Sequence, residues 1–167
     1  MSAKTALGLE EYLATAYEGP DPEYVDGELM ERAMPDTLHA GTQANLAGQF
    51  WVLKKRFGVR PKTEQRLLLA PDKVRIADLA VFWPNEPANR FPDSPPLVIV
   101  EILSPTDPMD QVQQRLSEFV EWGVRHVWLV DPRRRFLYLF ERTGLRSVPK
   151  LTVPELEVEF GPADIFD

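Results

Sequence analysis

The stretch that decides the fold is LVIVEIL, residues 97–103, an apolar run with a single carboxylate, Glu101, inside it. A strand that is apolar on both faces is typical of the centre of a sheet that is covered on two sides. The apolar spacing of residues 111–122 predicts a helix, and residues 126–130 then predict another buried strand. Because strand, helix and strand follow in this order, we expect one α/β domain with a mixed β-sheet flanked by helices.

Further elements are predicted on both sides of this step. The predicted helices cover residues 6–17, 35–57 and 111–122. The predicted strands cover residues 63–69, 74–82, 97–103, 126–130 and 136–140, with a weaker candidate at residues 151–160. An Asp26-Gly27 turn predicts a hairpin within residues 23–30. Gly58 is expected to end the second helix, whose predicted buried stripe is Leu38, Thr42, Leu46, Phe50, Leu53 and Phe57.

The composition is that of an ordinary globular domain. The 167 residues suit a single domain, with residues 1–22 as an N-terminal helical segment and residues 141–167 as a C-terminal extension of it. Cysteine is absent, which excludes disulfides and zinc–thiolate sites. No run approaches the roughly 20 apolar residues of a membrane span, and the first residues lack an apolar secretion segment. We therefore expect a cytoplasmic protein with no membrane partner.

The charge balance limits how the chain can bind nucleic acid. A net charge of −7 argues against a surface that binds phosphates everywhere, but it allows a local basic patch. Two basic runs, residues 54–56 and residues 133–135, could carry a DNA backbone if they flank an acidic site.

Glu101 is the first candidate for a functional residue. A lone carboxylate in a buried strand costs several kcal/mol of desolvation, roughly, unless something binds it. A structural interpretation pairs it with an arginine such as Arg66 or Arg75. A functional interpretation makes it a metal ligand or a catalytic acid or base.

Asp78 repeats the same anomaly in the apolar strand VRIADLAVF, residues 74–82. If the two strands are neighbours, their backbones lie about 4.8 Å apart and both carboxylates can bind one cation. Ligands that are all oxygen favour Mg²⁺ or Mn²⁺. The alternative is a structural aspartate near a strand end.

Three further side chains are candidates for the same site. Glu64 lies in the strand that precedes the Asp78 strand and is expected to form a hairpin with it. An exposed cross-strand ion pair explains this glutamate equally well. His39 begins the second helix beside its apolar stripe, where a capping or surface role is the default. Arg115 lies on the flank of the third helix with Gln111, and could hold a phosphate. Thr106 or Asp107 is the expected N-cap of that helix.

Several sequence blocks resemble one known family. They are EYVDGEL (23–29), TEQR (63–66), RIADLAVF (75–82), VEILSPTD (100–107) and VQQRLSEFVEWGVRHVWLVDP (112–132). Together they are similar to the Uma-type putative restriction endonucleases, a branch of the PD-(D/E)XK nuclease superfamily. The resemblance implies a restriction-endonuclease-like core and phosphodiester hydrolysis supported by Mg²⁺. It places Asp78 on the aspartate of the P-D element and Glu101 on the acidic residue of the E-x-K element.

The chain departs from the superfamily pattern at two positions. Ala77 replaces the proline of P-D, and Leu103 replaces the lysine of E-x-K. The resemblance implies that a basic residue on the following helix, here Arg115, takes over from this lysine. Arginine can stabilise developing negative charge but is a poor general base, so the cation itself would activate the attacking water.

The sequence therefore predicts a Mg²⁺- or Mn²⁺-dependent endonuclease that acts on DNA. Asp78 and Glu101 would hold the metal, Glu64 would assist through a water, Arg115 would contact the phosphate, and His39 and Gln113 would lie nearby. A homodimer is compatible with cutting both strands of a duplex. The alternatives are a catalytically inactive nuclease fold that serves as a binding or regulatory module, and a hydrolase of small phosphate esters.

Overall fold

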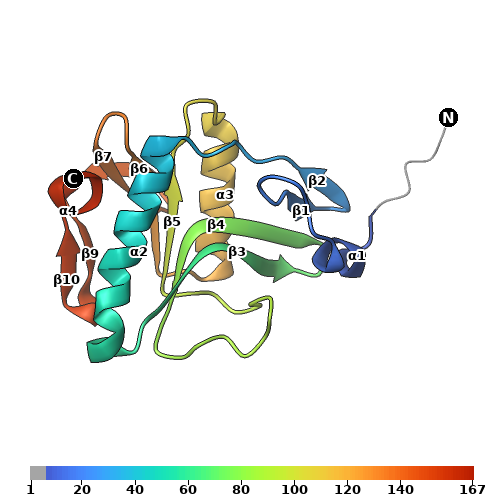
Figure 1. Cartoon of the computed structure of the whole chain (residues 1–167), viewed down its shortest axis with the longest axis horizontal. Coiled ribbons are helices and arrows are strands. Elements are labelled where there is room, and N and C mark those ends of the chain that lie inside the picture. Colours follow the sequence, from blue (N-terminus) through green and yellow to red (C-terminus); the bar gives the residue numbers. More distant parts are fainter. Residues whose placement is uncertain (1–6) are drawn as a thin grey trace.

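The strands whose sequences are apolar on both faces form the centre of the sheet. The computed structural model describes residues 7–167. Its central strands are β4 (Lys73–Phe82), β5 (Val98–Ile102) and β6 (His126–Asp131) (Figure 1). Nearly all of their residues are buried. The other strands are β1 (Glu23–Val25), β2 (Glu28–Met30), β3 (Arg60–Ala70), β7 (Phe136–Glu141), β8 (Gly144–Val148), β9 (Leu151–Val153) and β10 (Val158–Phe160). The helices are α1 (Leu9–Ala14), α2 (Thr37–Phe57), α3 (Met109–Trp122) and α4 (Pro162–Phe166), with a 3-10 turn at Pro154–Leu156.

Eight strands form one sheet, which is mixed, as the sequence predicts. Its order is β2-β1-β4-β5-β6-β7-β8, with β3 paired to β4 off this path, while β9 and β10 form a separate pair. Strands β5 and β6 are parallel and are joined by α3, and the other pairs are antiparallel. The predicted βαβ step is therefore confirmed.

One edge of β4 is shared by two different strands. Strand β3 pairs along one edge of β4. On the other edge, β1 pairs with β4 at residues 73–74, and β5 pairs with it at residues 79–81. Within the described residues, positions 75–78 therefore have no strand partner on that edge. The sheet is split at this point, and the split creates room for a site.

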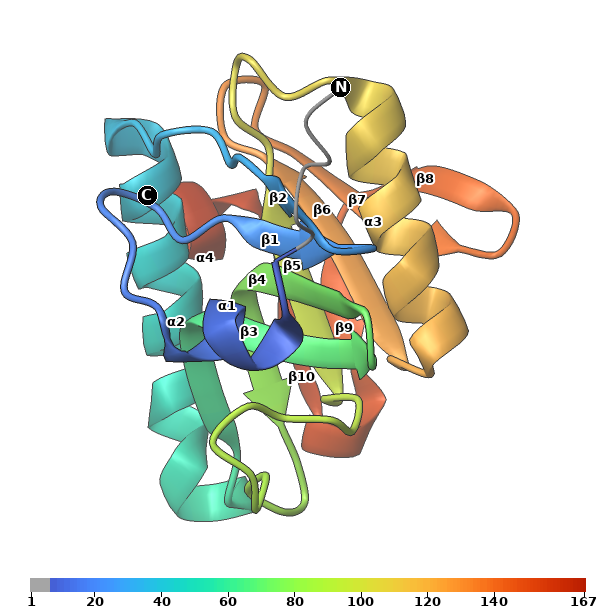
Figure 2. The same ribbon diagram turned by 90° about the vertical axis from the view of Figure 1, so that its right-hand side faces the viewer.

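Helices α2 and α3 cover opposite faces of the sheet (Figure 2). On the α2 face the core contains Leu46, Phe50, Val81, Val100 and Trp128, together with Leu151, Val153, Leu156, Phe160 and Ile165 from the C-terminal segment. On the α3 face it contains Val112, Leu116, Phe119, Ile99 and Leu129. The C-terminal segment thus packs into the same core as the central strands. Within residues 7–167, no helix is long and apolar enough to cross a bilayer.

The second helix matches its predicted ends but not all of its predicted stripe. Asp36 caps it by accepting a hydrogen bond from the backbone N–H of His39, and Gly58 ends it in the left-handed conformation. Leu38, predicted to be buried, is 48% exposed, whereas His39 is buried on the inner face. The buried stripe therefore begins at His39, one residue later than predicted.

The remaining differences are at element ends and in the C-terminal segment. Helix α1 ends at Ala14, three residues before the predicted end, and residue 6 lies outside the described residues. The predicted tail strand, residues 151–160, is in fact two short strands around a 3-10 turn, and β8 has no counterpart in the prediction. Pro108, without a side-chain cap, occupies the N-cap of α3, so the predicted Thr106 or Asp107 cap is wrong.

Candidate active site

Asp78 and Glu101 lie opposite each other at the split in the sheet. The last pair of the β4–β5 ladder is Leu79 with Val100, and the next opposing positions are Asp78 and Glu101. Directly opposed residues of an antiparallel pair project to the same face. Both carboxylates line one cavity, as the sequence argument requires.

The Asp78 carboxylate accepts a backbone hydrogen bond just beyond the end of this ladder. Its Oδ2 accepts a hydrogen bond of 2.7 Å from the backbone N–H of Ile102 and lies 3.3 Å from Nε2 of His39. Its Oδ1 lies 3.2 Å from Nη2 of Arg32. The carboxylate thus pairs with the buried N–H of Ile102, which has no strand partner there within the described residues, and its other oxygen faces the guanidinium group of Arg32.

Glu101 is buried and incompletely paired. Within the described residues, its Oε1 has no hydrogen-bond partner, and its Oε2 lies 3.4 Å from Nη2 of Arg115. Burial, reinforced by the negative charge of Asp78, raises the pKa of Glu101 to about 8, against the opposing effect of Arg115. A cation that reaches its free oxygen would favour the ionised form of Glu101.

The structural pairing of Glu101 with Arg66 or Arg75 is wrong. Arg66 binds Asp21, and Arg75 binds Glu23 and Glu118. The arginine that lies near Glu101 comes instead from α3, on the edge of the cavity.

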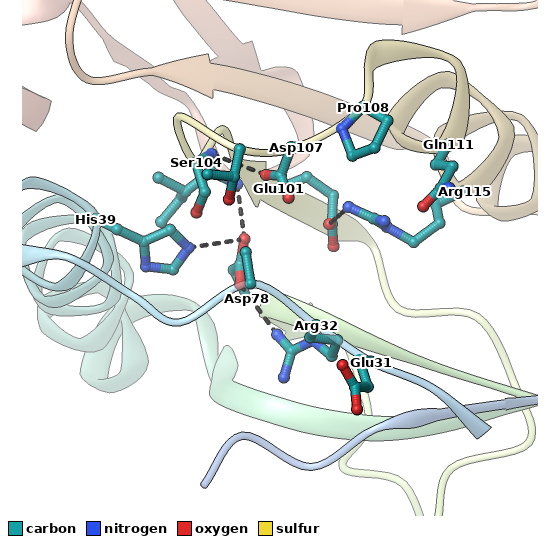
Figure 3. A pocket seen from close by; sticks show the side chains of 13 residues that line it. Glu31, Arg32, His39, Asp78, Glu101, Ser104, Asp107, Pro108, Gln111 and Arg115 are labelled. Carbon is teal, nitrogen blue, oxygen red and sulfur yellow. Dashed lines mark hydrogen bonds and ion pairs between the residues drawn. The ribbon is translucent and has the colours of Figure 1, made fainter.

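The cavity has a volume of about 270 Å³ and lies between His39 of α2 and the α3 residues Gln111 and Arg115 (Figure 3). In Figure 3, His39 enters from α2 on one side and Arg115 from α3 on the other, with Asp78 between them. The lining residues are Glu31, Arg32, Ala33, His39, Asp78, Glu101, Ile102, Ser104, Thr106, Asp107, Pro108, Gln111 and Arg115. Polar and charged groups dominate this lining, as in a site for a charged ligand.

His39 is part of the site and does not cap the helix with its side chain. Burial alone would lower its pKa, but the hydrogen bond and charge of Asp78 outweigh burial and hold the pKa of His39 above its usual value. Its Nδ1 is buried without a hydrogen-bond partner among the described residues. His39 therefore serves as a donor to Asp78.

Arg32 and Gln43 are site residues that the sequence reasoning missed. Arg32 bridges Glu64, 2.6 Å from Nη1, and Asp78, 3.2 Å from Nη2. Gln43 donates at 2.8 Å to Glu64 Oε1 and at 2.8 Å to the backbone oxygen of Asp78. Glu64 therefore reaches the site through Arg32 and is not a cross-strand partner. The only sequence signal for Gln43 is its position four residues after His39, on the same helix face.

Comparisons with known proteins show the family and the fold of this chain. The family model Uma2, described as "Putative restriction endonuclease", matches residues 9–162. The chain belongs to this family. A solved structure of a putative nuclease of DUF820 from Anabaena variabilis is 23% identical, covers 96% of this chain and 97% of its own, and superposes with a TM-score of 0.81. At this identity the likeness shows a shared fold. No curated protein matches the chain.

The resemblance to the Uma2 family, predicted from the sequence, is thus confirmed. In this member, Leu103 is partly buried and packs against the apolar core on the α3 face, so the expected lysine position carries an apolar side chain. Arg115 supplies the nearest cation to Glu101 instead. Gln111 lines the cavity with Arg115, whereas Gln113 is exposed and does not line it.

Only one of the two basic runs lies near the site of this Uma2 chain. Arg133, in the turn between β6 and β7, pairs at 3.0 Å with Asp36, the N-cap of α2. Residues 54–56 lie in the last turn of the 21-residue α2, roughly 25 Å along its axis from His39. Residues 54–56 therefore do not meet the condition, flanking the acidic pair, under which they could carry a DNA backbone.

The donor set fits a divalent ion that keeps part of its water shell. Within residues 7–167, no group of three or more His, Asp or Glu side chains is arranged to hold a metal. Mg²⁺ is commonly bound by one or two carboxylates and retains several waters. Two opposed carboxylates, one with a buried and unpartnered oxygen, provide such a donor set.

Proposed function

We propose that this protein is a Mg²⁺- or Mn²⁺-dependent endonuclease that hydrolyses phosphodiester bonds in DNA. The observation that carries the proposal is the unpartnered, buried Oε1 of Glu101 at the position opposite Asp78, within a polar cavity. Membership of a family described as putative restriction endonucleases supports the reaction class. Asp78 and Glu101 would hold the ion.

The acidic and basic side chains of the cavity have different proposed roles. A bound divalent ion would lower the pKa of water and neutralise phosphate charge. Arg115 and Arg32 line the cavity and are suited to hold phosphate oxygens, because the guanidinium group matches their geometry. Arginine does not release its proton, so neither acts as a general base. His39 and the backbone N–H of Ile102 keep the Asp78 carboxylate in place.

The test is cleavage of supercoiled plasmid and of single-stranded DNA in the presence of Mn²⁺ or Mg²⁺. Wild-type protein should cut, and Asp78→Asn and Glu101→Gln should each lose at least 100-fold in rate, about 2.7 kcal/mol or more. Glu141→Gln, an exposed strand-end change, is the matched control and should cut normally. Equal cutting by Asp78→Asn would mean that the activity arises elsewhere.

A second candidate is a binding module without catalysis. The observation that favours it is an arginine beside each acid, Arg32 at Asp78 and Arg115 at Glu101. This candidate predicts DNA binding that persists in EDTA and no rise in melting temperature with Mn²⁺.

We also propose that a homodimer cuts both strands of a duplex. Sedimentation of the protein with and without a short duplex tests this, and a single protomer bound per duplex would contradict it.

A further inference from the structure

Arg32 occupies an unusual place between two acids. Its side chain is 15% exposed and comes from residues 31–36, which have no regular secondary structure and join β2 to α2. Its Nη1 lies 2.6 Å from Glu64. Its Nη2 lies 3.2 Å from Asp78 (Figure 3). The contact with Glu64 is the shorter of the two, so Glu64 is the anchor and Asp78 the weaker partner.

The anchor is itself built by a local irregularity. Glu64 has a φ of +51°, a left-handed conformation that is uncommon for a residue with a side chain. The β3–β4 register passes from Thr63–Leu79 to Gln65–Ala77, which leaves Glu64 unpaired opposite Asp78. Gln43 stabilises this irregularity by donating to both the Glu64 carboxylate and the Asp78 carbonyl. The fold therefore holds Glu64 in position for Arg32.

The position of Arg32 affects any ion that binds at Asp78. In this structure the guanidinium group compensates the negative charge of a carboxylate that is only 5% exposed. A divalent ion held by Asp78 and Glu101 would place two positive charges close to this guanidinium, in a cavity where screening by water is weak. Binding the ion and keeping the Arg32–Asp78 contact therefore oppose each other.

We propose that Arg32 is a built-in counter-cation of Asp78 that sets the affinity of the site for its divalent ion. Arg32 neutralises Asp78 in the metal-free protein, and ion binding separates it from Asp78 while Glu64 retains it. Glu64 is thus a positioning residue that acts through Arg32. This inference rests on the proposed metal site at Asp78 and Glu101.

The experiment is calorimetric titration of the protein with MnCl₂, without DNA. Arg32→Gln removes the competing charge and should bind Mn²⁺ at least tenfold more tightly than wild type. Arg133→Gln is the matched control, since Arg133 is an exposed arginine paired with Asp36 outside the cavity, and it should bind as wild type does. Equal or weaker binding by Arg32→Gln, with a cooperative melting transition retained, overturns the proposal.

A change at Glu64 should have the opposite effect on the affinity for Mn²⁺. Glu64→Gln removes the anchor, leaves Arg32 on Asp78, and should weaken Mn²⁺ binding at least threefold. In the Arg32→Gln background the same change should have less than a twofold effect, because Glu64 acts through Arg32. Equal weakening in both backgrounds would show that Glu64 acts on the ion directly and overturns the positioning role.

The outcomes separate this inference from the proposed function. If wild type binds Mn²⁺ and Arg32→Gln binds it with the same affinity, the inference fails alone. If Asp78→Asn and wild type bind equally, or if neither wild type nor Arg32→Gln binds, the metal site fails and the inference fails with it.

Discussion

Asp78 has a structural role that is separate from any chemistry. Its Oδ2 accepts the backbone N–H of Ile102 at the point where the β4–β5 ladder ends. Asp78→Ala leaves this buried donor unpaired, which should cost about 1–3 kcal/mol in the free energy of unfolding. Asp78→Asn keeps an acceptor oxygen and should lose much less. Urea denaturation of the two variants measures the difference.

One result of these denaturation measurements would contradict the structural role of Asp78. Equal unfolding free energies for Asp78→Ala and Asp78→Asn would show that the hydrogen bond to Ile102 contributes nothing to stability. The carboxylate would then be retained for its charge alone.

At the residue scale, the sequence reveals acids that are costly to bury and does not reveal their partners. Asp78 and Glu101 interrupt apolar strands, so their burial and its desolvation cost could be predicted. Arg32 lies in a polar, irregular segment where an arginine is ordinary, and only the fold brings it next to Asp78. For Glu64 the sequence left two interpretations open, a site residue and an exposed cross-strand ion pair. The sequence TEQR does not reveal the left-handed backbone that turns Glu64 toward Arg32.

At the element scale, one ion-pair cluster fastens the C-terminal segment to the start of β6. Glu155, in the 3-10 turn at Pro154–Leu156, binds Arg125 at 2.7 Å and His126 at 2.8 Å. Although burial alone would raise it, the hydrogen bonds with Arg125 and His126 lower the pKa of Glu155 to about 2. The neighbouring Leu156 is fully buried in the core on the α2 face, so this turn matters for packing.

This cluster predicts a pH dependence of stability. The folded-state pKa of Glu155 lies below its unfolded value, so its contribution is complete above about pH 4.5 and disappears as the pH falls toward 2. Glu155→Gln should therefore lower the unfolding free energy by roughly 1–3 kcal/mol at pH 6, and the deficit should shrink at pH 3. Denaturation at both pH values measures it.

The matched control is Glu157→Gln. Glu157 pairs with Arg56 on the surface, where both side chains are well exposed, and such pairs contribute little. A deficit for Glu155→Gln that stays constant between pH 6 and pH 3 would contradict the ion-pair account.

Elements were predicted well where periodicity and end signals agree. The Asp26-Gly27 turn forms its hairpin, and Gly58 ends α2 in the left-handed conformation. The tail at residues 151–160 was predicted poorly, because its short strands depend on packing against Phe50 and Trp128, far away in the sequence. Local pattern carries little information about contacts of this kind.

At the scale of the whole molecule, the site exists because the sheet is split. Strand β1 and strand β5 share one edge of β4, and the interval between them holds Asp78. The parallel β5–β6 step could be predicted, because strand, helix and strand adjoin in sequence. The shared edge could not, because β1 comes long before β4 in the sequence and β5 comes after it, and no local pattern specifies that both pair with the same edge of β4.

Anomalous diffraction from crystals soaked in MnCl₂ tests the central claim most directly. The account predicts a manganese peak bound by oxygens of both Asp78 and Glu101, at roughly 2.0–2.3 Å, with Arg32 displaced from Asp78. A well-ordered cavity without manganese, or a peak bound elsewhere while Arg32 stays on Asp78, would contradict it.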